Sequence, residues 1–471
     1  MNRERLGVQD ALWLEMDRPT NPMVAEVVIW TATPVDLDRL RSALAERFVD
    51  RYPVFSSRPA RDDAGSWWEP DPGFDLDQHI ETATLADADN QADLQQLIAA
   101  RRVCMLHKGR PLWQVILVER YRTGSALVFR SHHAIADGMR IVQVAMSLFD
   151  ATPEGGAILA PPPAQHAARP RPEKGQSLLR GAMRLGRLTL REPLHAVRAA
   201  MAGVRQGLIR IVSAAPGFVD TARKLAFGPR NSATIWTGAA GPEKGIAWSD
   251  SLPLAAVKTV AKANHCTVND VLTAAVAGAL QEYLRSRGAH CSSVAFMVPV
   301  NLKPLDLTMP ARLGNEFALV QLELPTSSRD DGAVLATVKR RMDRIKKGNE
   351  AAVAFLLQRA IAGVSRGLYE ASVDLFTNRT TGVLTNVPGP PIPVYLAGAL
   401  VETIIGWAPV SGNQPMSFSI CSYNGRVTVG IATDTGLVPD YQTIAGGFTA
   451  AFDRIAAATP GAAQKAVPTA P

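Results

Sequence analysis

A stretch rich in proline, glycine and alanine divides this chain into two segments that each mix strand and helix patterns. It covers residues 154–175, EGGAILAPPPAQHAARPRPEKG, and has the composition of a linker. Before it, residues 23–30 (MVAEVVIW) predict a strand and residues 36–50 a helix with apolar residues at helical spacing. After it, residues 267–287 predict a helix and residues 294–302 a strand. We therefore expect two α/β halves joined by a long connection.

The shorter patterns set the expected boundaries of these halves. Residues 112–119 and 125–131 are β-rich runs around a polar turn and predict a hairpin, and residues 139–150 (MRIVQVAMSLFD) predict a helix. Residues 416–425 and 426–434 predict a second pair of strands. The expected division is an N-terminal half over 1–152, a linker with basic amphipathic helices over 153–226, and a C-terminal half over 227–471.

The composition argues against several classes of protein. No uninterrupted apolar run approaches the roughly 20 residues that a helix needs to cross a bilayer. The net charge of +7 is mild and the basic residues form no recognisable nucleic-acid motif, so no nucleic-acid partner is expected. The first residues lack an apolar signal core, which predicts a cytoplasmic protein. The four cysteines show no paired spacing, so neither a zinc site nor disulfides are expected: Cys104, Cys266, Cys291 and Cys421.

One segment of the connection predicts a basic amphipathic helix. In residues 177–191, SLLRGAMRLGRLTLR, four arginines recur at steps of four, three and four and share one helix face: Arg180, Arg184, Arg187 and Arg191. Such a helix either lies in a bilayer interface with its arginines near lipid phosphates, or packs on the two halves with a solvated arginine face. Amphipathicity alone favours the second interpretation, because any surface helix shows it.

The richest chemistry lies in FRSHHAIADGMR, residues 129–140, between a predicted strand and a predicted helix. His132 and His133 are adjacent on an extended segment and point to opposite faces, so they cannot both ligate one ion, and no metal is expected. A neutral imidazole can instead accept a proton from an attacking hydroxyl near pH 7. The alternative is a pair of structural histidines. Asp137 could anchor the loop through a buried ion pair, and Gly138 would permit a tight backbone where the helix begins.

HHAIADG resembles the HHxxxDG signature of CoA-dependent acyltransferases. Other segments narrow the resemblance to the bacterial wax ester synthase/acyl-CoA:diacylglycerol acyltransferase family. They follow in matching order over nearly the whole chain: QDALWLEMDRPTNPM (9–23), RPLW (110–113), VNDVL (268–272), VPVNLKP (298–304), LGNEF (313–317), TNVPGP (385–390) and ATDTGLVPD (432–440).

The resemblance implies two chloramphenicol-acetyltransferase-like α/β halves with mixed sheets and a tunnel between them that reaches His133 from two sides. Acyl-CoA would be a co-substrate, diacylglycerol or a fatty alcohol the acceptor, and triacylglycerol or a wax ester the product. His133 would act as general base for direct attack, with no further cofactor and no cysteine nucleophile. Such substrates imply a peripheral position on a membrane or lipid droplet.

Further residues are open to two interpretations. Asn269 is a candidate donor to the tetrahedral oxyanion, a contact typically worth a few kcal/mol, but the segment TVND equally suits a helix cap. Asp270 is expected to be structural. Lys303 stands where related enzymes commonly have the arginine that holds the motif aspartate, so its pairing with Asp137 would be looser or absent. The remaining motifs are expected to shape loops or turns: Pro111, Trp113, Gly314–Asn315 and Pro388–Pro390.

Two other functions fit the same sequence. The base could serve a different acceptor, such as a polyketide or glycolipid hydroxyl or an amine. Alternatively, the acyltransferase shell could be a non-catalytic lipid-binding scaffold at a membrane surface. The intact His133 and Asp137 favour an enzyme.

Overall fold

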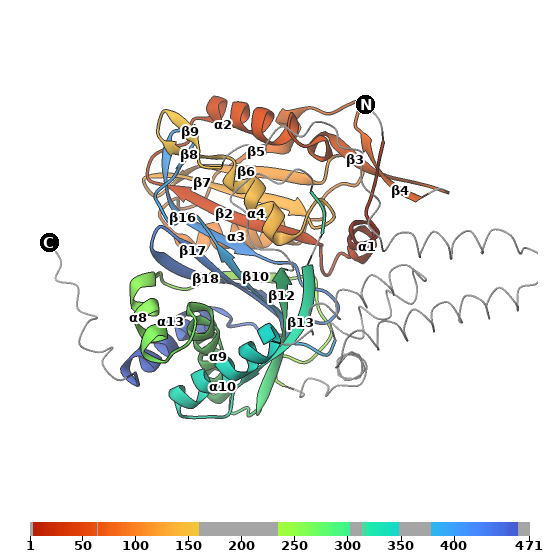
Figure 1. The fold of residues 1–471 in the computed structure, drawn as a ribbon. Coiled ribbons are helices and arrows are strands. Elements are labelled where there is room, and N and C mark those ends of the chain that lie inside the picture. Colours follow the sequence, from red (N-terminus) through yellow and green to blue (C-terminus); the bar gives the residue numbers. More distant parts are fainter. Residues whose placement is uncertain are drawn as a thin grey trace, which may run out of the picture.

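The structure, a computed structural model, describes residues 3–63, 65–159, 234–301, 313–315, 317–347 and 378–459. These residues form two large sheets, a three-stranded sheet and the helices that cover them (Figure 1). Among these residues, we find no helix with the length and apolar character needed to span a bilayer. The predicted arginine helix over 177–191 and Lys303 lie outside the described residues.

The first large sheet has eight strands and contains the predicted hairpin. The hairpin pairs antiparallel as β6 and β7, and the strand predicted over 23–30 is β2, which pairs with β7. The strand order is β5 (Ile80–Ala83), β6 (Trp113–Tyr121), β7 (Gly124–His132), β2 (Val24–Thr31), β16 (Ala399–Trp407), β15 (Tyr395–Leu396), β8 (Phe149–Thr152) and β9 (Gly155–Ala157).

Helices cover both faces of this sheet. On one face, Leu40 of α2 (Leu37–Leu44) and Ile141 of α4 (Gly138–Met146) share a buried cluster with Phe129 of β7. A π-helical turn, Ala45–Val49, extends α2 to the end of the predicted helix. On the other face, Leu94 and Ile98 of α3 (Gln91–Arg102) pack on further strand residues. The sheet is therefore buried on both sides.

The helix predicted over residues 139–150 is shorter in the structure. It ends at Met146, and Phe149–Thr152 forms β8, which pairs with β15 in the register Phe149 to Leu396. Asp150 also forms an ion pair with Arg47 at 2.8 Å. The helical periodicity was overridden here because tertiary strand pairing stabilises the extended conformation.

The second large sheet carries the rest of the C-terminal half. Its strands run in the order β10 (Lys244–Trp248), β18 (Arg426–Asp434), β17 (Met416–Tyr423), β14 (Gly382–Pro388), β12 (Ser293–Asn301) and β13 (Phe317–Pro325), with β11 (Leu252–Pro253) beside β18. Four helices lie on its side away from the first sheet (Figure 1): α8 (Leu254–Ala263), α9 (Val268–Ser286), α10 (Asp331–Lys347) and α13 (Gln442–Ala457). The predicted helix over 267–287 and the predicted strands over 294–302, 416–425 and 426–434 are confirmed as α9, β12, β17 and β18.

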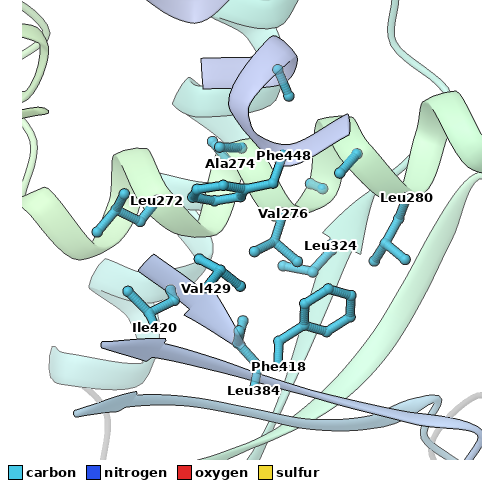
Figure 2. Close-up of a cluster of buried hydrophobic side chains, with 14 of the residues drawn as sticks. Leu272, Ala274, Val276, Leu280, Leu324, Leu384, Phe418, Ile420, Val429 and Phe448 are labelled. Carbon is cyan, nitrogen blue, oxygen red and sulfur yellow. The ribbon is translucent and has the colours of Figure 1, made fainter. Parts of the chain in front are cut away.

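Helix α9 is the centre of this second core. Figure 2 shows its side chains Leu272, Val276 and Leu280 packed among Phe448 of α13 and residues of the sheet. Small residues let α13 approach closely, since a Cβ at Gly278 would lie 2.9 Å from the Cβ of Ala451. Close packing of this kind accounts for the alanine-rich sequence of α9.

The C-terminal half contributes two strands, β15 and β16, to the first sheet. β16 belongs to the C-terminal half in sequence, yet it pairs antiparallel with β2 of the first sheet in the register Ile404 to Ile29. The linker-based division into 1–152, 153–226 and 227–471 stays a prediction. It does not foresee this contribution to the first sheet, because the pairing spans more than half of the chain. A small sheet, β1 (Glu4–Arg5), β4 (Gly65–Pro70) and β3 (Ser57–Asp62), lies at the N-terminal end beside α1 (Val8–Met16).

Candidate active site

A cavity of 180 Å³ lies between the two halves, where the tunnel was expected. One water needs only about 10–15 Å³, so this space suits a ligand. Its walls are β2, β16, α4 and the inward face of the second sheet. Among the described lining residues only Gly138 and Asn386 are exposed, so most of the wall is shielded from solvent.

His132 turns away from the cavity. It ends β7, and its Nδ1 accepts a hydrogen bond from the Ala134 N–H at 3.0 Å, so the proton is on Nε2, which faces Asp17 Oδ2 at 3.6 Å. Burial lowers the pKa of His132 although Asp17 opposes this. Burial alone would raise the pKa of Asp17, but His132, the Met23 N–H and Lys108 together lower it. His132 therefore joins β7 to the segment after α1.

His133 lies just beyond β7 and does line the cavity. Its N–H donates to the Met23 carbonyl at 2.8 Å, which fixes the backbone. Its ring stacks on Trp13 with centroids 4.2 Å apart and lies 5.7 Å from the ring of Phe317. Burial, with a smaller effect from His132, lowers the pKa of His133 to about 4, so the ring is neutral near pH 7.

Asn315 determines which nitrogen of His133 carries the proton. The Asn315 Nδ2 donates to Asp10 Oδ1 at 2.7 Å and to the His133 carbonyl at 2.9 Å, both of which only accept. The amide oxygen must therefore be the atom that lies 3.0 Å from His133 Nδ1, and Nδ1 must donate to it. Nε2 is left unprotonated, with a free lone pair. This is the state that a general base needs.

Asp137 and Gly138 shape the loop between His133 and α4. Asp137 is buried, and its Oδ1 accepts from the Arg140 N–H at 2.9 Å, so it caps α4. The expectation of a tight backbone at Gly138 is not met, because its φ is outside the left-handed region and a Cβ there would meet no atom within 4 Å. The missing side chain instead leaves the cavity wall open. The ion pair of Asp137 with Lys303 stays a prediction.

Asn269 does not reach the cavity itself but contacts a residue that lines it. Its Oδ1 accepts from Asn386 Nδ2 at 3.0 Å, and Asn386 lines the cavity whereas Asn269 does not. The helix cap belongs to its neighbours, since Thr267 and Asp270 form a reciprocal capping box at the start of α9. The oxyanion role of Asn269 stays a prediction.

Four residues that hold the two histidines were missed as functional residues in the sequence. Asp10 and Trp13 are three residues apart on one face of α1, and Asp17 follows just beyond the end of the helix; all three point at the histidines. In the sequence, this spacing within residues 9–23 was the signal that could have predicted their role. Asn315 was expected to serve only as a turn or a backbone approach, and its contact with His133 could not be foreseen, because the two residues are 182 positions apart.

A cysteine nucleophile has no support at this site. Cys421 lines the cavity, but burial raises the pKa of its thiol to about 11, so the thiolate is scarce near pH 7. Within the described residues, no group of three or more metal-ligating side chains is present. The neutral imidazole of His133 is thus the candidate proton acceptor in the described cavity.

Comparison with known proteins identifies the family. The model of the wax ester synthase/diacylglycerol acyltransferase catalytic domain matches residues 6–272, and the model of the C-terminal domain matches residues 313–456. The chain belongs to this family. It is accordingly an acyltransferase, as the HHxxxDG signature predicted.

Individual relatives agree with this family. A probable diacylglycerol O-acyltransferase of Mycobacterium tuberculosis is 25% identical over 455 residues, which cover 94% of this chain and 93% of that protein. The wax ester synthase/diacylglycerol acyltransferase of Marinobacter aquaeolei VT8 has a similar fold, with a TM-score of 0.66, 19% identity and coverage of 96% and 98% of the two chains. The first condensation domain of the calcium-dependent antibiotic synthetase follows at a TM-score of 0.61 and 15% identity, with 98% and 97% covered. The predicted fold class is confirmed.

Proposed function

We propose that this acyltransferase moves a long acyl chain from acyl-CoA to the hydroxyl of diacylglycerol or a fatty alcohol, with His133 as the general base. The observation that carries the proposal is the unprotonated Nε2 of His133 in a cavity that lies between the two halves. The match to the family catalytic domain supports the substrate classes.

The reaction needs one proton acceptor and no covalent intermediate. Nε2 of His133 takes the hydroxyl proton as that oxygen attacks the thioester carbonyl. The tetrahedral intermediate then collapses, the carbon–sulfur bond breaks, and the CoA sulfur receives the proton from Nε2. The products are an ester and free CoA. A base in this position accounts for roughly a hundredfold to ten-thousandfold in rate.

The apolar part of the cavity suits the chain of a lipid substrate. Ala25, Val27 and Ile29 lie on one face of β2, and α4 presents Ile141, Val142 and Ala145 to the same space. From Met23 beside His133 to Ile29, six residues of strand span roughly 20 Å. An extended long-chain acyl group has a similar length.

We also propose that Asn386 and Asn269 assist the oxyanion. Asn386 lines the cavity and donates one amide hydrogen to Asn269 Oδ1, so Asn269 orients the side chain that touches the cavity. The second amide hydrogen of Asn386 is then the donor available to a ligand. The Asn269→Ala variant would lose this orientation.

The direct test is transfer of labelled palmitoyl-CoA to hexadecanol or to diolein. We expect neutral lipid from at least one acceptor, and at least a hundredfold loss of kcat in His133→Ala. His79→Gln is a matched control, because His79 is also buried but does not line the cavity. Its stability should fall while its activity persists.

Other outcomes would assign other functions. Ester from neither acceptor, but consumption of acyl-CoA with a polyketide or glycolipid hydroxyl or an amine, would keep the base and change the acceptor. Lipid binding without any turnover would indicate the scaffold instead. Full activity in His133→Ala would remove the imidazole from the mechanism.

We further propose that the protein associates peripherally with membranes or lipid droplets. The support is the spacing of Arg180, Arg184 and Arg187 in the connection, which lies outside the described residues. The chain should float with vesicles that contain anionic lipids, and replacing these three arginines by glutamine should weaken flotation. Unchanged flotation of the triple variant would make the helix ordinary surface architecture.

A further inference from the structure

We propose that Asp10 and Asn315 are positioning residues that hold His133 in its reactive tautomer and stabilise the ring when it becomes protonated. This inference rests on the proposed role of His133 as general base. It adds two residues, from two separate segments, to the machinery around that ring.

The Asn315 amide is locked in one orientation. Its three polar contacts join Nδ2 to Asp10 Oδ1 (2.7 Å), Nδ2 to the His133 carbonyl (2.9 Å) and Oδ1 to His133 Nδ1 (3.0 Å). A rotation of the amide by 180° would place its oxygen against two acceptors. Because Asn315 is buried, water cannot readily replace these bonds. The tautomer of His133 therefore follows from this amide.

Asp10 keeps the amide in place and supplies charge. Its Oδ1 accepts from both the Nδ2 and the backbone N–H of Asn315, the latter at 3.2 Å. When His133 takes a proton on Nε2, the ring becomes positive and its Nδ1–H bond to Asn315 strengthens. The Asp10 carboxylate lies on the far side of the same amide, where its negative charge favours that protonated ring. Asp137 and His132 are the other ionisable groups that act on this pair.

Three distant segments assemble this unit. Asp10 comes from α1, His133 from the loop after β7, and Asn315 from the C-terminal half, 305 residues after Asp10. A purely structural role would need only that these contacts tie α1 to the C-terminal half. A positioning role makes an additional demand, because the tautomer of the ring must change when the amide is removed. This difference can be measured.

The experiment compares Asn315→Ala and Asp10→Asn with wild type in the full chain. The first readout is kcat and KM for palmitoyl-CoA with hexadecanol. The second is the ¹⁵N spectrum of the histidine side chains, in which His133 is identified by its loss in His133→Ala. Asn264→Ala is the control, since Asn264 also forms two side-chain hydrogen bonds but lies away from the cavity.

The expected results separate the two residues. Wild type should show His133 protonated on Nδ1 and unprotonated on Nε2. Asn315→Ala should show a mixture of tautomers and a kcat lower by about ten- to a hundredfold, with KM within about threefold, as for loss of an orienting group. Asp10→Asn keeps an oxygen for the Asn315 donors, so it should retain the tautomer but lose about tenfold in kcat. Asn264→Ala should change neither readout.

Two results would overturn the inference. One is a wild-type tautomer in Asn315→Ala, whatever its activity, since the amide would then be merely structural. The other is unchanged kcat in both variants. If Asn315→Ala does not fold, the kcat of Asp10→Asn tests the inference, and an unchanged kcat would overturn it. An error in the proposed role of His133 as general base would be recognised separately, because His133→Ala would then remain active.

Discussion

Two adjacent imidazoles have different environments because consecutive residues at the end of a strand face opposite ways. His132 packs against Asp17, which also accepts a hydrogen bond from the Met23 N–H. His133 faces the cavity. Among the described residues, none donates a hydrogen bond to its Nε2. The first ring fixes the loop, so that the second can be held within reach of a ligand.

The buried histidines predict a loss of stability in mild acid. The pKa of His133 is about 4 when folded and 6.5 when exposed, so the unfolded chain binds its proton first as the pH falls. The contribution of His133 to the free energy of unfolding is therefore complete above pH 6.5 and is lost as the pH falls toward 4. At pH 5 the loss from this residue is about 2 kcal/mol. Urea unfolding at pH 7.5 and pH 5 measures it.

The matched variant for this prediction is His133→Gln. It cannot titrate, so its stability should fall less between the two pH values than that of wild type. Some fall should remain, because burial also lowers the pKa of His132 and of His79. Parallel curves for wild type and variant would show that His133 is not buried in its neutral form.

At the scale of elements, α4 packs on one face of the first sheet and also forms a wall of the cavity. Val144 is buried in the core and does not line the cavity, whereas Val142 is half-buried and lines it. A substitution at Val142 can therefore change the space for a lipid chain without changing the contacts of His133.

We predict that Val142→Phe shortens the accepted acyl chain. The larger ring would fill the space between α4 and β2, so kcat/KM for palmitoyl-CoA should fall about tenfold or more, whereas that for a short acyl-CoA should change little. Val142→Ala, which enlarges the same space, should keep activity with palmitoyl-CoA. An equal loss for short and long chains in Val142→Phe would place the chain elsewhere.

A buried ionic cluster holds another wall of the cavity. Glu26 of β2 pairs with Arg102 at 2.6 Å and with Arg130 at 3.2 Å, and all three are buried. Arg102 also donates to the Ala408 carbonyl at 2.9 Å, just beyond β16. The cluster thus joins α3 and the first sheet to the cavity-lining segment contributed by the C-terminal half.

At the scale of the whole molecule, the position of β16 in the first sheet couples the two halves. The strand pairs with β2 over Val401–Trp407, and β15 precedes it in the same sheet, whereas β14 and β17 on either side of this pair belong to the second sheet. Trp30 and Trp248 also pack against each other across the junction, with ring centroids 5.7 Å apart. The core on the first sheet is therefore not complete without the C-terminal half, which supplies residues such as Trp248 and Ile405 to it.

This coupling predicts a single unfolding transition. Tryptophan fluorescence and far-UV circular dichroism should give the same urea midpoint, because loss of β16 exposes the first sheet and opens the second at once. Thr403→Pro should move both midpoints down together, since proline inside a paired strand removes a hydrogen bond. Two separated transitions in wild type would show that each half folds alone.

The amino-acid sequence by itself determined the local features of this protein. Strands β2, β6, β7 and β12, helix α9 and the position of the HHxxxDG loop followed from periodicity and motif, because each depends on neighbours within about 20 residues. The tertiary structure alone decided the rest. It ended α4 at Met146, moved β16 into the first sheet, and brought Asp10, Trp13 and Asn315 to His133. These outcomes depend on packing and hydrogen bonds between residues that are hundreds of positions apart, and no local pattern specifies such partners.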